Sequence, residues 1–376
     1  MSKVLVMDST YDTCQEQVEQ AFSTFPIDLY GKKVAIKMNA LRACNPDREA
    51  LVTHYKLVKA VIEKVETLKP AQLIVGDSVG TESYGCSEHV FSNTRLKEAS
   101  GLHYRNFNKN LTLVQMEHPF KRKVALLKDV LEADVYISLP KMKTHGLTRI
   151  SGAIKNNYGL LAGAQKAWFH YHSVDPKIFA RVVIELFRIR PPDLVIMDAV
   201  LAMEGYGPAS PETRWVNKIL ASNDPVALDT VEARIIGFNV EEVPYLILAR
   251  DLALGETDLN AIEVIGKATP IGDYHRPVPP ESSYSYKAGV GSGRTSIEFY
   301  RQRVAYRPVI TAGKCPPGCK ACVEVCPSGA LTLRSLKPYL DSANSLLCSA
   351  CKEACQWSAL ELHPDEQIMS LLAQKT

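Results

Sequence analysis

The ten cysteines of this 376-residue chain are distributed very unevenly along it. Seven lie between Cys315 and Cys355, and the 314 residues before that segment contain only Cys14, Cys44 and Cys86. A disulfide framework would spread its bridges through the chain and would suit an oxidising compartment. Cysteines gathered in one short segment are instead typical of a metal-binding module.

The spacing of these cysteines is typical of an iron–sulfur protein. The segment begins with the run Cys315-x3-Cys319-x2-Cys322-x3-Cys326-Pro327, whose first gap is one residue longer than usual. Residues 348–362 repeat residues 319–333, with three cysteines, an Ala-Leu pair and a final Leu in common. The repeat resembles the two-cluster bacterial ferredoxin family, in which the fourth cysteine of a run reaches the other cluster. A zinc ribbon needs paired CxxC knuckles, which the gaps of three residues fit poorly.

The second copy of the run lacks one ligand. Asn344 stands at the position equivalent to Cys315, and Gln356 replaces the proline after the fourth cysteine. The ferredoxin resemblance implies crossed ligation, with one complete [4Fe–4S] cluster on Cys315, Cys319, Cys322 and Cys355. The second site then has three thiolates, from Cys326, Cys348 and Cys351. It would hold a [3Fe–4S] cluster, a [4Fe–4S] cluster with one non-cysteine ligand, or no cluster.

Two interpretations of this three-cysteine site are open. An iron with a free coordination position would be a Lewis acid that could bind substrate. Alternatively, the site holds an ordinary relay cluster whose ligand shell is completed by Asp341, Ser345 or water. Cys44 and Cys86 follow expected strands, and either could supply the fourth thiolate, although a buried free cysteine is the commoner fate.

Residues 1–268 alternate short apolar runs with helical patterns. The apolar runs are expected to form strands at 3–7, 33–37, 72–76, 134–139, 193–197 and 261–265. Strands that are apolar on both faces are typical of a parallel sheet covered on each side. The helical patterns include 54–68, 176–188 and 225–236. We therefore expect an α/β domain with a mostly parallel sheet and flanking helices.

The rest of the chain divides into three further segments. Residues 269–313 are rich in Pro, Gly, Ser and Tyr and are expected to form an extended connector. Their GVGSGRTS stretch has no preceding strand and no following GKS or GKT, so a flexible loop is favoured over a phosphate loop. Residues 314–363 are expected to form a small ferredoxin-like α+β iron–sulfur domain, and residues 364–376 a C-terminal helix.

The densest group of candidate functional residues follows the strand expected at 134–139. No Asp or Glu occurs from Val135 to Val174, whereas solvated surfaces usually mix both signs of charge. We expect a basic loop there and a helix that starts near Leu147. The loop carries Lys141, Lys143 and His145, and the helix carries Arg149 and Lys155. The pattern predicts a pocket for carboxylate or phosphate at the end of a strand, with a basic surface loop as the alternative.

Three stretches make the chain similar to a known family. LPKMKTHGLTRISGAIKNNYGL, MDAVLAMEGYGP and ILASNDPVALDTVEARIIGF resemble the domain-of-unknown-function 362 family, over about residues 30–265. The resemblance implies a fold and a ferredoxin-type module, but no settled reaction. Its motif positions here are Lys141, Lys143, Thr144, His145, Lys155, Asn156, Asp198, Glu204, Gly205, Asp224 and Asp229.

The acidic residues among these positions have two expected roles. Asp198 ends an expected strand and Glu204 follows it in a glycine-rich loop, so both are expected to face the basic loop as acid–base partners or metal ligands. Asp224 and Asp229 are expected to be structural, with Asp224 as a helix N-cap. The aromatic cluster at 168–172 could line a flat substrate site, form a lid, or pack against the connector.

The composition and the motifs of the chain argue against several other classes of function. The chain has 44 Lys and Arg against 41 Asp and Glu, which gives no electrostatic argument for nucleic-acid binding. No apolar run is long enough to predict a membrane span, and the first residues lack the features of a signal peptide. The VGDSVG stretch lacks the GxGxxG order, so bound NAD is not expected. These features favour a cytoplasmic protein.

We expect the chain to be an iron–sulfur oxidoreductase. Its ferredoxin-type module would exchange electrons with an external donor or acceptor protein and pass them to a small anionic substrate in the α/β domain. The expected catalytic residues are Lys141, His145 and Glu204, and the expected substrate-binding residues are Lys143, Thr144, Arg149, Lys155 and Asn156. One alternative is a non-catalytic electron carrier with a docking α/β domain. Another is a metal-dependent non-redox enzyme with structural clusters, in which a divalent ion is bound by Asp198, Glu204 and His145.

Overall fold

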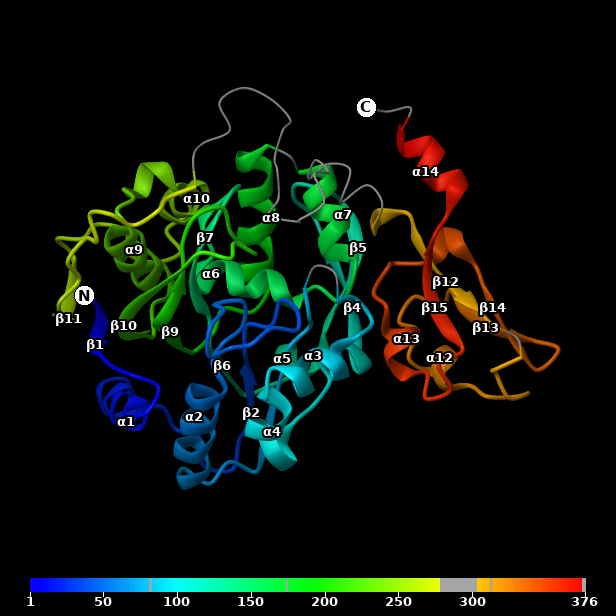
Figure 1. Cartoon of the computed structure of the whole chain (residues 1–376), viewed down its shortest axis with the longest axis horizontal. Helices are drawn as coiled ribbons and strands as arrows, with labels where there is room; N and C mark the ends of the chain where they lie inside the picture. The colour runs from blue at the N-terminus through cyan, green and yellow to red at the C-terminus, as the bar shows by residue number, and fades with distance from the viewer. Residues whose placement is uncertain (81–82, 174, 278–302, 312, 374–376) are drawn as a thin grey trace.

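A nine-stranded sheet forms the centre of the α/β domain (Figure 1). The computed structural model of the chain describes residues 1–80, 83–173, 175–277, 303–311 and 313–373. The strand order is β11 (Ile262–Gly266), β1 (Ser2–Asp8), β10 (Thr213–Ser222), β9 (Leu194–Met203), β6 (Val135–Ser138), β2 (Lys33–Lys37) and β3 (Gln72–Gly76), with β7 (Lys141–His145) paired to β9 and to β8 (Arg149–Ile150). Only β10 is antiparallel to both of its neighbours, and β8 is antiparallel to β7. The mostly parallel α/β sheet expected from the sequence is confirmed.

The six strands predicted from apolar runs all form in this sheet, and five of them differ from the predicted bounds by at most one residue at each end. The strand predicted at 193–197 continues six residues further as β9, so Asp198 lies within it. The apolar-run pattern does not predict β10, because its first half carries polar side chains and is only partly buried. The prediction around Leu147 is wrong. Lys141–His145 forms a buried strand where a loop was expected, and the next helix, α6 (Gly152–Asn156), starts five residues later than predicted.

The side chains of the central strands alternate between two apolar cores. In β1, Val4 and Val6 belong to one core, and Leu5 and Met7 belong to the other. The first core packs under α6, α8 (Pro176–Ile189), α9 (Pro225–Ile236) and α10 (Pro244–Asp251). The second packs under α1 (Cys14–Thr24), α2 (Tyr55–Thr67), α3 (Ser87–Asn93) and α4 (Leu96–Ser100). Burial on both faces explains why these strands are almost continuously apolar.

Further elements lie on the side of the domain that faces the C-terminal unit (Figure 1). They are the hairpin of β4 (Leu111–Met116) and β5 (Arg122–Leu127), the short α5 (Lys128–Leu131) and α7 (Gln165–His172). Helix α7 contains the aromatic cluster noted in the sequence. Its Phe169 is buried in the main core, so this aromatic side chain packs inside the domain.

The C-terminal unit consists of two strand pairs and short helices. β12 (Tyr306–Ile310) pairs antiparallel with β15 (Leu360–Pro364), and β13 (Leu331–Arg334) pairs antiparallel with β14 (Lys337–Leu340). α12 (Ala321–Glu324) and α13 (Ala350–Ala354) occupy equivalent places in the two sequence repeats and pack together. A small core is formed by Cys322, Leu331, Cys351 and Leu360. The final helix is α14 (Glu366–Ala373).

Strand β12 belongs to this unit although its residues lie in the segment expected to be a connector. The C-terminal unit therefore begins before residue 314. The GVGSGRTS stretch of the expected connector lies outside the described residues. Across the described ranges, the structure contains no helix with the length and apolar character needed to span a membrane.

The C-terminal unit contacts the α/β domain through polar and apolar side chains. The Glu353 carboxylate accepts hydrogen bonds from the Ser87 amide and hydroxyl at 2.9 and 2.6 Å, and from Asn106 Nδ2 at 3.0 Å. Lys352 Nζ lies 3.5 Å from Cys86 Sγ. An apolar cluster also joins α7 to the unit, with Tyr84, Ala164, Ala167, Val304 and Leu347 buried in it.

Candidate functional site

The carboxyl ends of three parallel strands meet at one edge of the sheet. Lys37 ends β2 and is in register with Gly76 at the end of β3 and with Ser138 at the end of β6. Asp77 follows β3 directly, and Lys141 begins β7 three residues after the end of β6. Open α/β sheets bind their ligands at this edge, so a ligand site is expected among the residues that follow these strand ends.

A small, strongly basic pocket of about 80 Å³ lies at this edge. Its wall contains five lysines from β2, β7, α6 and α7, namely Lys37, Lys141, Lys143, Lys155 and Lys166. Neutral polar side chains share the wall, among them Asn39, Ser78, Asn156, Tyr158 and His170. We call this site the lysine pocket. Lysine side chains are almost never fully buried unless paired, so five around one small volume need an explanation.

Two of the five lysines are paired with buried carboxylates. Lys37 Nζ lies 2.7 Å from Asp77 Oδ1. Lys141 Nζ lies 2.8 Å from Asp198 Oδ2 and also donates to the Tyr11 hydroxyl at 2.8 Å. The Lys141 and Asp198 side chains are both 0% exposed, so removing either one would leave the other as an uncompensated buried charge.

Lys143 and Lys166 donate only to neutral oxygens in the described part of the chain. Lys143 Nζ donates to Asn39 Oδ1 at 2.5 Å and to a backbone carbonyl at 2.8 Å. Lys166 Nζ donates to the Ser78 hydroxyl at 2.7 Å and to two backbone carbonyls. Burial lowers the pKa of each of these amines to about 7.

Lys155 is the least satisfied of the five. Its Nζ lies 5.5 Å from the centre of the Tyr158 ring and 6.0 Å from that of Phe179. No carboxylate among the described residues forms an ion pair with it. Burial lowers the pKa of the Lys155 amine to about 7. Because no carboxylate among the described residues pairs with it, the Lys155 amine is available to a ligand in the lysine pocket.

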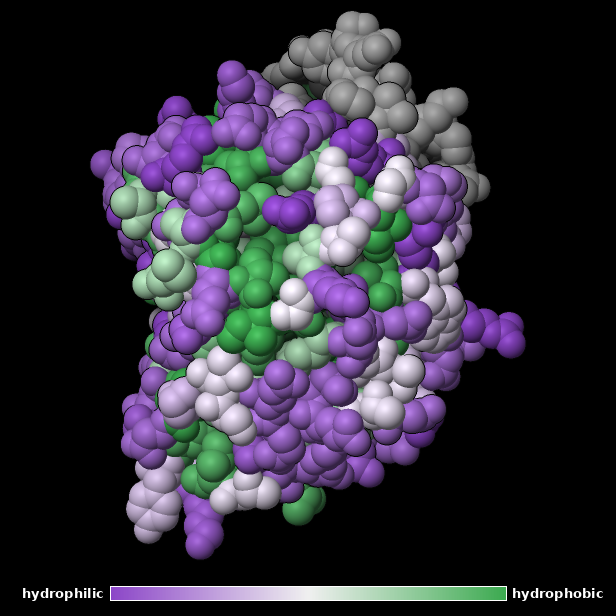
Figure 2. Space-filling model, turned by 90° about the vertical axis from the view of Figure 1, so that its left-hand side faces the viewer, coloured by the Kyte–Doolittle hydropathy of each residue, from purple (hydrophilic) through white to green (hydrophobic). Residues whose placement is uncertain are grey.

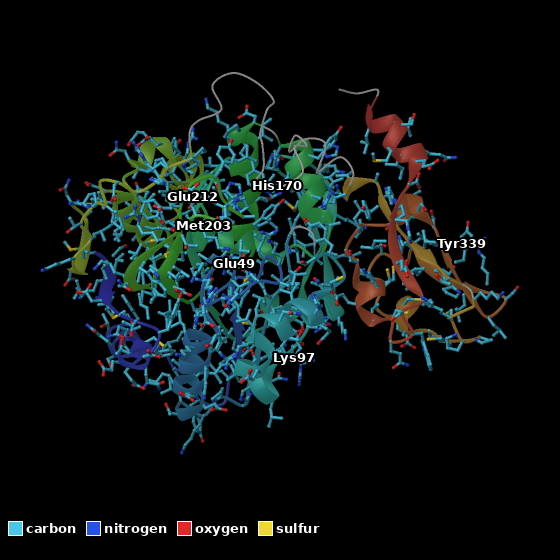
Figure 3. All side chains as sticks on the ribbon, viewed as in Figure 1. Glu49, Lys97, His170, Met203, Glu212 and Tyr339 are labelled. Carbon is cyan, nitrogen blue, oxygen red and sulfur yellow. The ribbon has the colours of Figure 1, made fainter. Side chains whose placement is uncertain are left out.

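Helix α7 connects the lysine pocket to the C-terminal unit. Lys166 and His170 reach the pocket from one side of the helix, and Figure 3 shows His170 inside the α/β domain. The Tyr158 hydroxyl donates to the Lys166 carbonyl at 2.6 Å and lies 2.9 Å from His170 Nδ1. On the other side of α7, the Tyr171 hydroxyl donates to the backbone of α14 at 3.4 Å.

The seven cysteines of the C-terminal unit form two electrostatic groups. Burial raises the pKa of Cys322, and the neighbouring thiols of Cys315, Cys319 and Cys355 raise it further. Burial also raises the pKa of Cys348 to about 11 and that of Cys351 even higher. The thiols that act most strongly on this second pair are those of Cys326 and Cys348. By these neighbours, one group is Cys315, Cys319, Cys322 and Cys355, and the other is Cys326, Cys348 and Cys351. The two groups adjoin, because Cys322 also raises the pKa of Cys351.

A second small pocket lies at the three-cysteine group. Cys326, Cys348 and Cys351 line it together with the side chains of Ser328, Ser345 and Ser349. Ala164 of the α/β domain is also in its wall. Neither Cys44 nor Cys86 lines this pocket, and burial raises the pKa of Cys44 to about 12 beside the α/β lysines. In the described ranges, no three His, Cys, Asp or Glu side chains converge as the ligands of a single metal ion would.

The comparison with protein families assigns the part of the chain that builds the lysine pocket. The family model described as "Domain of unknown function (DUF362)" matches residues 34–234, and all five lysines lie in that range. The chain belongs to the DUF362 family. A thylakoid-associated protein of Synechocystis sp. is 30% identical over 233 residues, which cover 60% of this chain and 70% of that protein.

Two solved structures share a weaker likeness with the DUF362 chain. The lactate racemase apoprotein of Thermoanaerobacterium thermosaccharolyticum superposes with a TM-score of 0.43 and 12% identity, over 63% of this chain and 57% of that one. A protein of Thermotoga maritima superposes with a TM-score of 0.39 and 12% identity, over 58% of this chain and 57% of that one. The chain thus spans little more than half the length of either structure.

Four of the site residues predicted from the sequence line the lysine pocket of the DUF362 domain. They are Lys141, Lys143, Lys155 and Asn156. Asn156 Oδ1 accepts a hydrogen bond from Lys37 Nζ at 3.3 Å, and its Nδ2 donates to Ser138 Oγ at 2.9 Å. The prediction of Asp198 opposite Lys141 is confirmed by their ion pair.

Two predicted residues of β7 lie beside the lysine pocket rather than in its wall. His145 packs against the Phe179 ring, and its Nδ1 accepts from the Leu147 amide at 3.1 Å. Burial holds the pKa of His145 well below its ordinary value. Thr144 is buried, and its hydroxyl has no hydrogen-bond partner in the described structure. The structure therefore does not support His145 and Thr144 as residues that contact a ligand in the lysine pocket.

The prediction that Glu204 faces the basic residues is wrong. Its carboxylate binds Arg214 at 2.7 Å and accepts from the His275 amide at 3.1 Å. It lies outside the lysine pocket, so Asp198, Glu204 and His145 do not form one metal site. The expected structural roles of the other acids are confirmed, because Asp224 caps α9 and Asp229 accepts from the first amides of α6.

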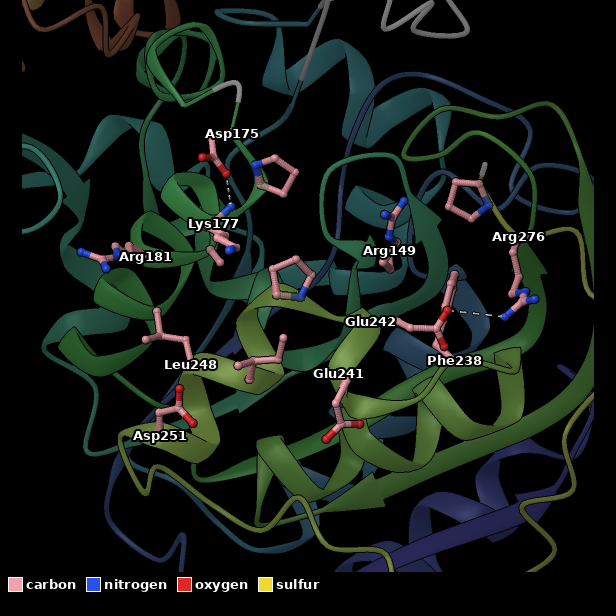
Figure 4. Close-up of a pocket in the computed structure, with 15 residues that line it drawn as sticks. Arg149, Asp175, Lys177, Arg181, Phe238, Glu241, Glu242, Leu248, Asp251 and Arg276 are labelled. Atoms are coloured by element: carbon pink, nitrogen blue, oxygen red, sulfur yellow. Dashed lines mark hydrogen bonds and ion pairs between the residues drawn. The ribbon is translucent and has the colours of Figure 1, made fainter. Parts of the chain in front are cut away.

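Arg149 lies in a different cavity. A groove of about 960 Å³ is lined by α8 and α10, and Arg149 of β8 reaches it together with Phe238 and Leu248 (Figure 4). The face that carries α9, α10 and β11 has apolar residues in its middle and hydrophilic residues around them (Figure 2). The predicted role of Arg149 beside Lys143 is therefore not supported, since the two residues line separate cavities.

Sequence reasoning missed Lys37 and Lys166. The signal for Lys37 was available, because Lys37 ends one apolar strand and Asp77 directly follows the next one. Adjacent parallel strands end at the same edge of a sheet. The signal for Lys166 was the segment without acidic residues, which extends to Val174 and includes it.

Proposed function

We propose that this protein is an iron–sulfur reductase that delivers electrons to a small anion held in the lysine pocket. The cysteines of the C-terminal unit would hold the clusters, and an external protein would supply the electrons. Clusters bound there would provide single electrons at a potential set by their ligands and surroundings.

The two cysteine groups support crossed ligation. The four-cysteine group takes Cys355 from the second repeat, and the three-cysteine group takes Cys326 from the first, as in the two-cluster ferredoxin pattern. The packed helices α12 and α13 bring Cys322 and Cys351 into one small core. We therefore assign a complete [4Fe–4S] cluster to Cys315, Cys319, Cys322 and Cys355.

The three-cysteine group fits a cluster with one non-cysteine ligand. Cys326, Cys348 and Cys351 line one small pocket, and Ser345 lies in the same wall. Ser345 is adjacent to Asn344, which occupies the position of the first cysteine in the repeat. We therefore propose Ser345, or a water beside it, as the fourth ligand of a second [4Fe–4S] or [3Fe–4S] cluster.

A short series of contacts between the two pockets carries the proposal. Lys166 Nζ donates to Ser78 Oγ at 2.7 Å, and the Gly163 amide lies 3.4 Å from the same oxygen. A Cβ on Gly163 would overlap the carbonyl oxygen of Cys348, so the two backbones touch there. The three-cysteine group is thus separated from the lysine pocket by a few packed residues, which favours transfer of electrons between them.

The lysine pocket offers what the reduction of an anion needs. Its unpaired lysines attract a negatively charged substrate and stabilise charge that develops during reduction. Amines with a pKa of about 7 can also donate protons near neutral pH. The ion pairs of Lys37 and Lys141 hold the strand ends in place and are assigned a positioning role.

Reoxidation of the reduced protein tests this function. The anaerobic protein would be reduced with dithionite, freed of reductant and mixed with fumarate, sulfite or nitrite, while the visible absorbance of the clusters is followed. We expect at least one anion to reoxidise the wild type, and Lys166→Met to slow that step by about tenfold or more, as expected for the loss of one hydrogen bond to a charged group. The exposed Lys177 of α8 provides a control, and Lys177→Met should react as the wild type does.

One result would instead indicate the non-catalytic carrier. In that case an electron-transfer protein would reoxidise the clusters rapidly. Small anions would reoxidise the wild type no faster than they reoxidise the Lys166→Met variant.

A further inference from the structure

The lysine pocket carries more positive charge than the described residues around it neutralise. Of its five lysines, two face Asp77 and Asp198, so three remain without a carboxylate in the described structure. The three are Lys143, Lys155 and Lys166. They come from β7, α6 and α7, so their convergence requires the tertiary fold and is not a local run of surface lysines.

Two of these three lysines are nearly inaccessible to solvent. Lys143 is 2% exposed and Lys166 is 5% exposed, and each already donates to neutral oxygens that cannot balance a full charge. Lys155 faces aromatic rings on one side and the pocket on the other. An unbalanced group of this kind is costly to bury, so the site is built for a ligand that supplies the missing negative charge.

We propose that the lysine pocket binds one small oxoanion with at least two negative charges, held jointly by Lys143, Lys155 and Lys166, and that the protein takes up protons as the anion binds. The proposal names the substrate class of the proposed reductase and rests on the same pocket, but it does not depend on the clusters. The volume of about 80 Å³ holds only a few water-sized groups, which suits a sulfate, a phosphate or a short dicarboxylate and excludes a nucleotide.

The proton uptake follows from the burial of the three amines. Each has a pKa of about 7 in the pocket without ligand, so most of them are neutral at pH 8. A dianion within hydrogen-bond distance favours the charged form and raises each pKa. At pH 8 binding should therefore take up more than one proton, whereas at pH 6 the amines are already charged and the uptake should be small.

Other ionisable groups lie near these three amines, and their contribution to proton uptake must be distinguished from that of the amines. The nearby ion pairs are those of Lys37 with Asp77 and of Lys141 with Asp198. Burial lowers the pKa of Lys37 and of Lys141, and the carboxylate beside each amine opposes that change. His145 and His170 have pKa values far below neutrality and Cys44 one of about 12, so all three stay uncharged. Asp229, which caps α6, has a pKa raised to about 7. Its contribution is common to the wild type and to any lysine variant, so a comparison between them removes it.

Isothermal titration calorimetry with sulfate tests the proposal directly. Sulfate keeps its charge from pH 6 to pH 8, so any proton exchange belongs to the protein, and buffers with different ionisation enthalpies report its size. We expect sulfate and malonate to bind and acetate to bind far more weakly. Lys155→Met should weaken sulfate binding by about tenfold or more.

The Lys155→Arg variant keeps a positive charge at this position and distinguishes the effect of that charge from the effect of proton uptake. Because a guanidinium stays protonated, this variant should keep most of the affinity and lose about one proton of uptake at pH 8. Lys177→Met should match the wild type, and thermal unfolding of each variant would confirm that it is folded. The proposal is overturned if neither dianion binds more tightly than acetate, or if the uptake at pH 8 is the same in the wild type and Lys155→Arg. If dianions bind but do not reoxidise the clusters, the anion-binding inference holds and the proposed reductase function is contradicted.

Discussion

Replacing Gly163 with alanine perturbs the contact between the α/β domain and the three-cysteine group. Gly163 is buried and has a φ of +55°, in the left-handed region that L side chains rarely adopt. A Cβ there would overlap the carbonyl oxygen of Cys348 and would lie 2.9 Å from Ser349 Oγ. The substitution therefore adds backbone strain and also pushes the C-terminal unit away from the lysine pocket.

The size of the effect can be worked out with a matched control. Gly31 has a φ of +68° and nothing within 4 Å of the position that a Cβ would take, so Gly31→Ala introduces the strain alone. That strain costs about 1–2 kcal/mol. The clash at Gly163 adds about 1–3 kcal/mol, as other overpacked sites do. We expect Gly163→Ala to lower the free energy of unfolding by about 2–5 kcal/mol in total and Gly31→Ala by about 1–2 kcal/mol.

Urea unfolding and electron paramagnetic resonance of the reduced protein would measure both variants. Gly163→Ala should change the signal of the cluster at the three-cysteine group, and Gly31→Ala should leave all signals unchanged. If the two variants lose equal stability and give identical spectra, Gly163 does not hold the two units together and the proposed path for electrons loses its support.

Three further predictions concern charges at the same site. Asp198→Asn leaves Lys141 buried without its partner and should destabilise the protein by about 3–5 kcal/mol in urea unfolding. Adding Lys141→Met should recover part of that loss, because the unpaired buried charge is then removed. Equal stability of the single and double variants would contradict the buried ion pair. The folded pKa of Lys155 lies below its unfolded value, so between pH 7 and pH 9 the unfolded state binds more protons and stability rises with pH. Lys155→Met should reduce that slope by about 1.4 kcal/mol per pH unit, and an unchanged slope would mean that folding does not lower the pKa of Lys155. Glu353→Gln weakens the contact with Ser87 and should increase proteolysis between the two units, whereas wild-type resistance would show that this hydrogen bond is dispensable.

The main sheet could be predicted from the sequence because its strands are buried on both faces. Apolar runs such as residues 72–76 allow few other structures, and the helices between them have clear apolar faces. Strand β7 could not be recognised in this way. Its sequence, KMKTH, is polar because two of its side chains line the lysine pocket, so a functional strand resembles a loop in the sequence.

The candidate site was predicted in part. The absence of acidic residues pointed to Lys143 and Lys155, and both line the lysine pocket without a carboxylate partner among the described residues. The partners of Glu204 could not be predicted, since Arg214 and His275 approach it from distant parts of the chain. The cysteine grouping stays a prediction that the arrangement of the C-terminal unit supports.

Iron and acid-labile sulfide analysis with electron paramagnetic resonance tests the central claim most directly. The anaerobically purified protein would be measured as isolated and after dithionite, beside Cys322→Ser and Cys348→Ser. We predict two cluster signals in the wild type, loss of the four-cysteine cluster in Cys322→Ser, and loss of the three-cysteine cluster alone in Cys348→Ser. A wild type without stoichiometric sulfide, or variants that lose the same signal, would contradict two clusters with crossed ligation and with them the proposed reductase.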